Sequence, residues 1–239
     1  MVRREEHRAA LRALDDRDVP AYLTAHSGLP GPRGNLELID AFADVAPGPL
    51  VRALADDADE YLRCCGTAAL GRLLLEAADD PDAEHLRALL RERAADPLWR
   101  VREATAMALQ RVGDGDPAAL RTLVAGWVRD AHPLVRRAAV AGICEPRLLR
   151  DPATAEAALA ACAEATASLA ALPAGARRDP DVRTLRQALG YCWSVAVAGA
   201  PGAGLPEFAA LRAGAGADTD VAWVVRENEK KSRLRRLLD

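Results

Sequence analysis

The segment DPLWRVREATAMAL, from Asp96 to Leu109, decides the fold because its pattern recurs along the chain. DAHPLVRRAAVAGI, from Asp130 to Ile143, has the same order: an aspartate, an apolar residue five positions later, an arginine directly after it, and a stretch rich in alanine. In both segments the apolar and small residues recur at helical spacing, so each predicts a helix with one buried stripe. Alanine on such a stripe lets neighbouring helices approach closely.

The spacing of six residues between an aspartate and an arginine occurs four times in this context. The pairs are Asp57 and Arg63, Asp96 and Arg102, Asp130 and Arg136, and Asp220 and Arg226. Two weaker copies are centred on Arg33 and Arg183, and successive arginines of the series stand 30 to 47 residues apart. Periods of that length are typical of repeats built from a pair of helices.

We expect the four aspartates to lie in the short turn before the second helix of each pair. A carboxylate in that place can accept hydrogen bonds from the first amides of the helix and favours its positive end. The arginine six residues later is within reach of an ion pair, either inside its own turn or with the next repeat. The sequence therefore predicts a structural ladder made of these aspartates and arginines.

Apolar periodicity and the positions of the prolines predict the helices. They cover residues 3–15, 19–26, 34–45, 48–56, 59–77, 82–94, 98–112, 116–129, 132–144, 153–172, 181–198, 205–213 and 218–236. The prolines fall at helix starts and ends, where their missing amide is tolerated. The glycine-rich stretches 199–206 and 212–218 are expected to be loops, and no clear linker divides the chain.

With its paired aspartate and arginine, the valine before the arginine and the alanine-rich second helix, the chain resembles bacterial HEAT-repeat proteins over roughly residues 19–238. The resemblance implies an all-α, armadillo-like fold, an α-solenoid of about six HEAT-like helix pairs whose second helices line a concave face. We expect residues 1–18 to form an N-terminal capping helix and residues 19–239 to form one repeat domain. HEAT arrays mostly serve as binding platforms, so the resemblance implies a protein-interaction or scaffold module without catalysis.

Composition narrows the class of protein further. The net charge of −3 and the pI near 5.9 give no global reason to expect nucleic acid or an acidic membrane as the main partner. The five cysteines form no CxxC pair, which predicts reduced thiols in a cytoplasmic protein. The first residues lack the apolar region of a signal peptide, and the longest nearly apolar stretch, 188–201, is too short to span a bilayer.

Patterns that carry catalysis or metal binding are missing from the sequence. The four histidines form no H-x-x-x-H or HExxH motif, and there is neither a G-x-S-x-G nor a GxxxxGK[ST] motif. We therefore expect no catalytic residues, no metal, no cofactor and no enzymatic activity.

A second resemblance provides the alternative function. Bacterial HEAT-like alkylpurine DNA glycosylases are of nearly this length, and the resemblance implies a DNA-binding protein with a catalytic aspartate beside tryptophans. Asp130 follows Trp127 by three residues, but the repeat already explains it. Trp99 and Trp223 each stand two residues before the apolar residue of their repeat, which indicates a shared packing role.

Candidate binding residues lie on the exposed column of the second helices and in the basic C-terminal segment. The former are Arg137, Gln187 and Tyr191, and the latter are Arg226, Lys230, Lys231 and Arg233. The column resembles a moderately polar protein-contact surface. The basic segment can meet an acidic partner or phosphates, or it can be the solvated face of a capping helix. The proline-rich segment 27–35 is a further candidate contact, or a simple connection between helices.

Overall fold

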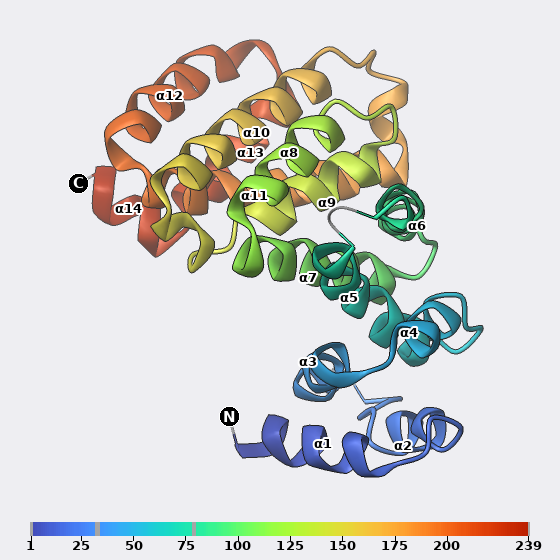
Figure 1. Ribbon diagram of the computed structural model, residues 1–239. Coiled ribbons are helices and arrows are strands. Elements are labelled where there is room, and N and C mark those ends of the chain that lie inside the picture. Colours follow the sequence, from blue (N-terminus) through green and yellow to red (C-terminus); the bar gives the residue numbers. More distant parts are fainter. Residues whose placement is uncertain (1, 32–33, 78–79, 239) are drawn as a thin grey trace. The chain divides into compact units, whose positions relative to one another are not determined.

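The computed structural model describes residues 2–31, 34–77 and 80–238, and Figure 1 shows that they form an all-α fold. The α-helices are α1 (Val2–Ala13), α2 (Val19–Ala25), α3 (Leu36–Val45), α4 (Gly48–Ala55), α5 (Glu60–Glu76), α6 (Asp82–Ala94), α7 (Trp99–Gly115), α8 (Pro117–Trp127), α9 (Pro133–Ile143), α10 (Pro152–Ala170), α11 (Pro180–Gly199), α12 (Pro201–Gly214), α13 (Thr219–Glu229) and α14 (Ser232–Leu238). These ranges hold no strand, and none of their helices is long and apolar enough to cross a membrane. The predicted all-α repeat fold is confirmed.

The chain divides into two compact units, Met1–Val112 and Gly113–Asp239, and the boundary falls inside α7. Within the first unit, α1 lies against α3, α3 against α5, and α4 against α5. The capping helix over residues 1–18 and the single domain over residues 19–239 stay predictions. The first copy of the repeat, at Arg33, lies outside the described residues.

Two glycines of α5 show how closely the helices of the first unit approach. A Cβ atom on Gly66 would lie 2.1 Å from the backbone nitrogen of Ala55, and one on Gly71 would lie 2.2 Å from the carbonyl oxygen of Ala108. Neither position leaves room for a side chain. The backbone of α5 therefore contacts α4 on one side and α7 on another.

The second unit is organised around α11, which contacts α9, α10, α12, α13 and α14. Its residues Leu189, Trp193 and Val197 are buried. The indole Nε1 of Trp193 donates a hydrogen bond of 3.0 Å to Thr166 Oγ1 of α10, which satisfies the buried polar atom. Most of α11 is therefore core, and its few exposed residues are held on a rigid element.

The turn aspartates Asp57, Asp96 and Asp130 share one geometry. The carboxylate of each accepts a hydrogen bond of 2.8 Å from the amide two residues later. Arg63 and Arg102 donate to the carbonyl oxygens of Asp57 and Asp96, at 2.7 Å in both cases. Arg63 also lies 3.1 Å from the carboxylate of Asp96, so it joins one repeat to the next.

The fourth aspartate of the predicted ladder occupies a different place. Asp220 lies in the first turn of α13 instead of the turn before it, and Asp218 is the residue that caps this helix. The ladder arginines Arg63, Arg102 and Arg136 are the fourth residues of their helices, whereas Arg226 is the eighth residue of its helix. The expected position of Asp220 is therefore wrong, because the spacing of six recurs there in another helical register.

Asp220 instead binds two arginines that the ladder did not include. Its carboxylate lies 2.5 Å from Arg186 of α11 and 3.4 Å from Arg177. Arg183, on which the sequence analysis centred this weaker copy of the repeat, is exposed. The contact between α11 and α13 thus uses an arginine one turn further along the helix.

Two more differences concern the C-terminal third. α12 begins at Pro201, inside the stretch expected to be a loop, because Pro201 occupies the first turn, where its missing amide costs nothing. Gly204 then packs so closely that a Cβ would lie 2.8 Å from Val197 Cα. The helix expected over residues 218–236 is interrupted at Lys230, and α14 starts at Ser232.

Candidate functional site

Tyr191 is the exposed aromatic residue of α11. Its side chain is 42% exposed, whereas the residues from Cys192 to Val197 are buried. Gln187, one helical turn earlier, is exposed on the same side of the helix. An exposed tyrosine on a helix that is otherwise core offers a rigid contact residue.

Two cations lie over the ring of Tyr191. The guanidinium carbon of Arg233 is 4.9 Å from the ring centroid, and the ammonium nitrogen of Lys231 is 5.7 Å from it. Arg233 also donates a hydrogen bond of 2.8 Å to the phenolic oxygen. Cation–π attraction and this hydrogen bond together hold the side chains of Lys231 and Arg233 beside α11.

Glu227 of α13 lies among the remaining cations. The hydrogen bond from Lys230, at 2.5 Å, holds the pKa of the Glu227 carboxyl below its usual value, and the charges of Lys231 and Arg226 lower it further. The structure thus places six of the predicted binding residues on α11, α13, α14 and the turn between α13 and α14. We call them the C-terminal face: Gln187, Tyr191, Arg226, Lys230, Lys231 and Arg233.

The seventh candidate, Arg137, is on α9, a helix that packs against α11. It is half-buried and has polar interactions of its own. The candidates of the predicted column therefore lie on α9 and α11, two helices in contact.

Buried contacts between α11 and α13 position the face. Asn228 is fully buried, and its amide nitrogen donates to the carbonyl oxygens of Leu189 and Val224, both at 2.8 Å. Its side-chain oxygen accepts a hydrogen bond of 2.8 Å from the amide of Ser194. These bonds join α13 to the part of α11 that carries Tyr191. The sequence analysis missed Asn228, because its neighbours Glu227 and Glu229 are charged and its burial depends on its partners in α11.

Gly190 and Trp223 complete this contact. A Cβ on Gly190 would lie 2.8 Å from the Trp223 ring, so only glycine lets the indole lie flat against α11. The guanidinium carbon of Arg186 also lies over that ring, 4.8 Å from its centroid. Trp99, in contrast, is 52% exposed at the first residue of α7. An arginine lies over each tryptophan ring, with Arg100 4.7 Å from the Trp99 centroid, but Trp223 lies one turn deeper in its helix, so the two residues share only part of a packing role.

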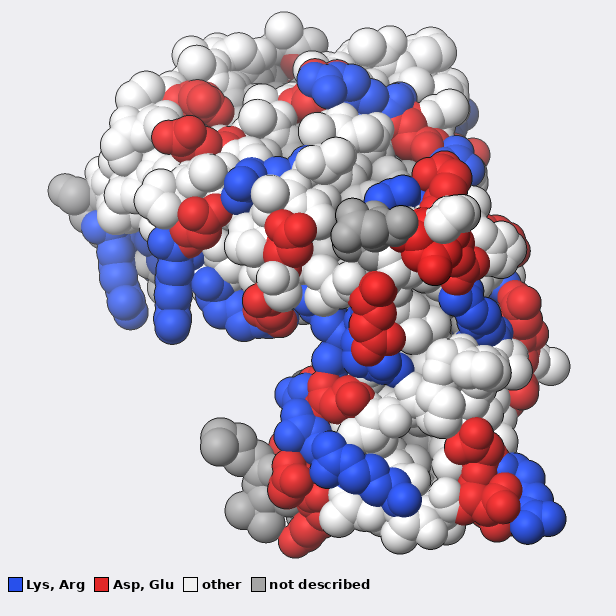
Figure 2. Space-filling view, in the orientation of Figure 1, with Lys and Arg blue, Asp and Glu red and all other residues white. Residues whose placement is uncertain are grey.

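The cations of the C-terminal segment have few acidic partners. Within the described part of the chain, no carboxylate lies within ion-pair distance of Arg226, Lys231, Arg233, Arg235 or Arg236. Basic side chains gather over α14 on the surface that Figure 2 shows. Glu229, the other acidic residue of the segment, pairs with Arg212 of α12 at 3.3 Å. Of the described residues from Arg226 to Leu238, six are basic and two are acidic, so this part of the segment carries excess positive charge.

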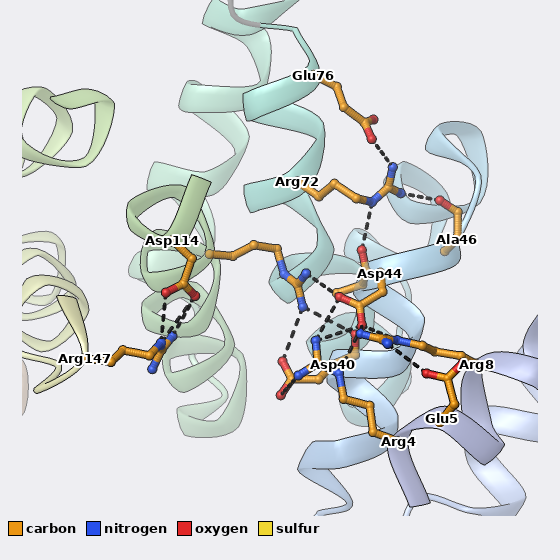
Figure 3. A network of polar contacts seen from close by, with 12 residues as sticks. Arg4, Glu5, Arg8, Asp40, Asp44, Ala46, Arg72, Glu76, Asp114 and Arg147 are labelled. Atoms are coloured by element: carbon orange, nitrogen blue, oxygen red, sulfur yellow. Dashed lines mark hydrogen bonds and ion pairs between the residues drawn. The ribbon is translucent and has the colours of Figure 1, made fainter. Parts of the chain in front are cut away.

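Arginines of the first unit are arranged in the opposite way (Figure 3). Asp44 of α3 accepts hydrogen bonds from Arg4 at 2.9 Å, from Arg8 at 2.6 Å and from Arg111 at 2.6 Å. Burial opposes its ionisation, but the three arginines outweigh that effect and hold the pKa of the Asp44 carboxyl below its usual value. Asp40 lies beside two of them, so each charge has a partner. We call Asp44 and its three arginines the Asp44 cluster.

Leu29 and Pro30 of the proline-rich segment line an open cavity in the first unit. Its volume is about 430 Å³, and Tyr61 and Arg100 are also among the lining residues. Arg100 is already paired with Glu60 at 2.8 Å, and Tyr61 donates a hydrogen bond to the carbonyl oxygen of Asn35. The polar groups of this cavity therefore serve the fold. Pro32 and Arg33 lie outside the described residues.

The residues that catalysis or metal binding could use are buried or hydrogen-bonded within the fold. Trp127 is buried, and Asp130 accepts the His132 amide hydrogen bond described above. All five cysteines are free and buried. Over the part of the chain that the structure describes, no group of three His, Cys, Asp or Glu residues is placed to hold a metal ion.

Comparison with known proteins gives one match. Residues 47–144, from just before α4 to just after α9, match the family described as HEAT repeats. No curated protein and no solved structure matches the chain. The resemblance to alkylation-repair proteins stays a prediction.

Proposed function

We propose that this chain, in which residues 47–144 match HEAT repeats, acts without catalysis, as a protein-interaction or scaffold module. Helical repeats present extended surfaces built from rigid elements, and such surfaces suit binding. The proposed partner is another protein, with no cofactor and no metal. Because its cysteines are free, we place the protein in the cytoplasm.

One observation carries the choice of contact surface. Tyr191 is exposed, Arg233 and Lys231 lie over it, and no carboxylate of the described residues is within ion-pair distance of either cation. Tyrosine and arginine are the residue types that contribute most to binding energy at protein interfaces. The C-terminal face therefore combines an aromatic contact with unneutralised charge on a fixed scaffold.

Nucleic-acid binding is the second candidate function, and the same cations support it. Several basic residues on one surface can neutralise phosphates and release counterions, so such binding would fall steeply between low and physiological salt. The engagement of Trp127 and Asp130 in the fold favours a non-catalytic form of this alternative. Absence of duplex DNA binding at low salt would eliminate it.

Site-directed photocrosslinking in the native cell tests the proposed function. A photoreactive amino acid replaces Gln187 in one variant and Glu156, an exposed residue of α10, in the matched control. We expect protein adducts at position 187 that survive nuclease treatment and are weaker at position 156. Adducts of equal strength at both positions, or adducts that nuclease removes, would contradict the proposal.

A further inference from the structure

The cations beside Tyr191 are held in place before any partner binds. Arg233 has its guanidinium fixed by the phenolic oxygen at 2.8 Å and by the ring below it. Ordering a long side chain normally costs binding free energy, and prior ordering removes part of that cost. A carboxylate that reaches this position would therefore meet a donor that is already oriented.

Two acidic residues lie near the C-terminal face and bear on the length of a negatively charged segment that could bind there. Glu227 lies beside Lys230 and close to Gly190, and Glu229 lies against Arg212. A long phosphate backbone requires a continuous basic track. Here two carboxylates of α13 interrupt the positive surface, so a short acidic segment fits it better than an extended polyanion.

The C-terminal helix also offers apolar contact. Leu237 and Leu238 of α14 are 36% and 41% exposed, and α14 lies against α11, which carries Tyr191. Protein interfaces combine apolar and aromatic contacts with charged hydrogen bonds, whereas a phosphate backbone offers no apolar side chain. The mixture of exposed leucines, tyrosine and cations therefore favours a polypeptide.

We propose that the C-terminal face binds a short acidic peptide segment, with carboxylates paired to Arg233 and Lys231 and an apolar side chain beside Tyr191. This inference rests on the proposed function, because it names the chemistry of the partner protein. The full chain is the binding unit, since α11 holds the face through contacts with α13 and α14.

Fluorescence anisotropy with defined probes tests the inference. The first probe is a labelled peptide of alternating Asp and Glu around one Phe, and the second has Asn and Gln in place of the acids. A third probe is single-stranded DNA of similar length, and a fourth is duplex DNA. We expect the acidic peptide to bind at least about tenfold more tightly than the amide peptide, as one well-placed charged hydrogen bond predicts. It should also bind more tightly than either DNA.

Variants separate a specific site from general attraction of charges. Arg233→Gln and Tyr191→Ala should each weaken acidic-peptide binding about tenfold. Arg183→Gln removes the same charge from an exposed site on α11 outside the face, and it should leave the affinity nearly unchanged. Circular dichroism and thermal unfolding confirm that each variant is folded.

Equal loss in Arg183→Gln, tighter binding of DNA, or equal affinity for the acidic and amide peptides would each overturn the inference. If crosslinking at position 187 captures a protein while the acidic peptide fails to bind, the chemistry proposed here is wrong and the proposed function stands. If position 187 yields no protein adduct and the acidic peptide fails to bind, both proposals fail.

Discussion

The Asp44 cluster and the C-terminal face both contain arginines, but the surroundings of these arginines differ. In the Asp44 cluster three guanidinium groups converge on one carboxylate whose side chain is only 14% exposed. In the C-terminal face the cations lie over an exposed ring, and the described residues supply few carboxylates. The difference shows that the carboxylates around an arginine distinguish a structural cation from one available to a partner.

The physical basis is the cost of desolvation. A partly buried guanidinium loses hydration, and a carboxylate that accepts its hydrogen bonds offsets that loss. An exposed guanidinium keeps its hydration and needs no such partner, so the fold gains little from it. Substitutions in the two regions should therefore change different measurable quantities.

The largest expected effect tests whether helix packing or charge pairing dominates the stability of the first unit. In Gly66→Ala the new methyl group meets the backbone of α4, so the helices must separate, and we expect a loss of about 3 kcal/mol or more. Gly126→Ala on α8 is the matched control, since nothing lies within 4 Å of its Cβ. The control should be neutral or slightly stabilising by helix propensity. Equal urea midpoints for the two variants would contradict the close packing.

The next effect concerns the support behind the C-terminal face. Asn228→Ala leaves the Ser194 amide and the Leu189 carbonyl without their buried partner, and we expect a loss of about 2 kcal/mol. Because the face rests on α11 and α13, acidic-peptide affinity should also fall. A variant with wild-type unfolding free energy would show that Asn228 does not hold these helices together.

Asp44→Asn measures the Asp44 cluster itself. The substitution keeps the shape and removes the charge that three partly exposed arginines share, so we expect a loss of about 2 kcal/mol after allowance for solvent screening. Acidic-peptide binding should stay at the wild-type level. Loss of peptide affinity in this variant, without unfolding, would remove the distinction between the two regions.

The pH dependence of the unfolding free energy also tests the charge of the Asp44 cluster. Burial raises the pKa of Asp44, but the hydrogen bonds from its arginines lower it more, so its folded pKa lies below the unfolded value of about 3.9. Its contribution to stability is complete above the unfolded pKa and is lost as the pH falls through the folded pKa. The difference in unfolding free energy between wild type and Asp44→Asn should therefore shrink as the pH falls below about 4. A constant difference across that range would contradict the pKa shift.

The smallest effect is expected in the C-terminal segment. Arg236→Gln removes an exposed cation for which the described residues provide no carboxylate, so the unfolding free energy should change by less than about 0.5 kcal/mol. Chemical denaturation of this variant beside Asp44→Asn makes the comparison direct. A loss as large as that of Asp44→Asn would show that Arg236 is structural.

Local patterns predicted most of the fold. The recurrence of Asp96 and Arg102 at Asp130 and Arg136 identified the repeats, because turn geometry requires the same residue types each time. At Asp220 the same spacing led to a wrong position, since spacing alone does not set where a helix begins. The interruption at Lys230 and the helix starting at Pro201 likewise depend on contacts with α11 and on close packing at Gly204.

The candidate site was predictable in part. Tyr191 and the basic residues of α13 and α14 were identifiable as exposed, because they lie outside the apolar stripes. The supporting roles of Asn228, Gly190 and Trp223 could not be identified from the sequence, since these roles depend on residues of another helix.

By itself, the sequence determined that the chain folds into helical repeats with capped turns, because helical periodicity and capping act over a few residues. Only the tertiary structure decided which arginines are neutralised and which remain available. That choice depends on which carboxylate a long side chain reaches across neighbouring helices, as Arg111 reaches Asp44 and Arg233 reaches Tyr191.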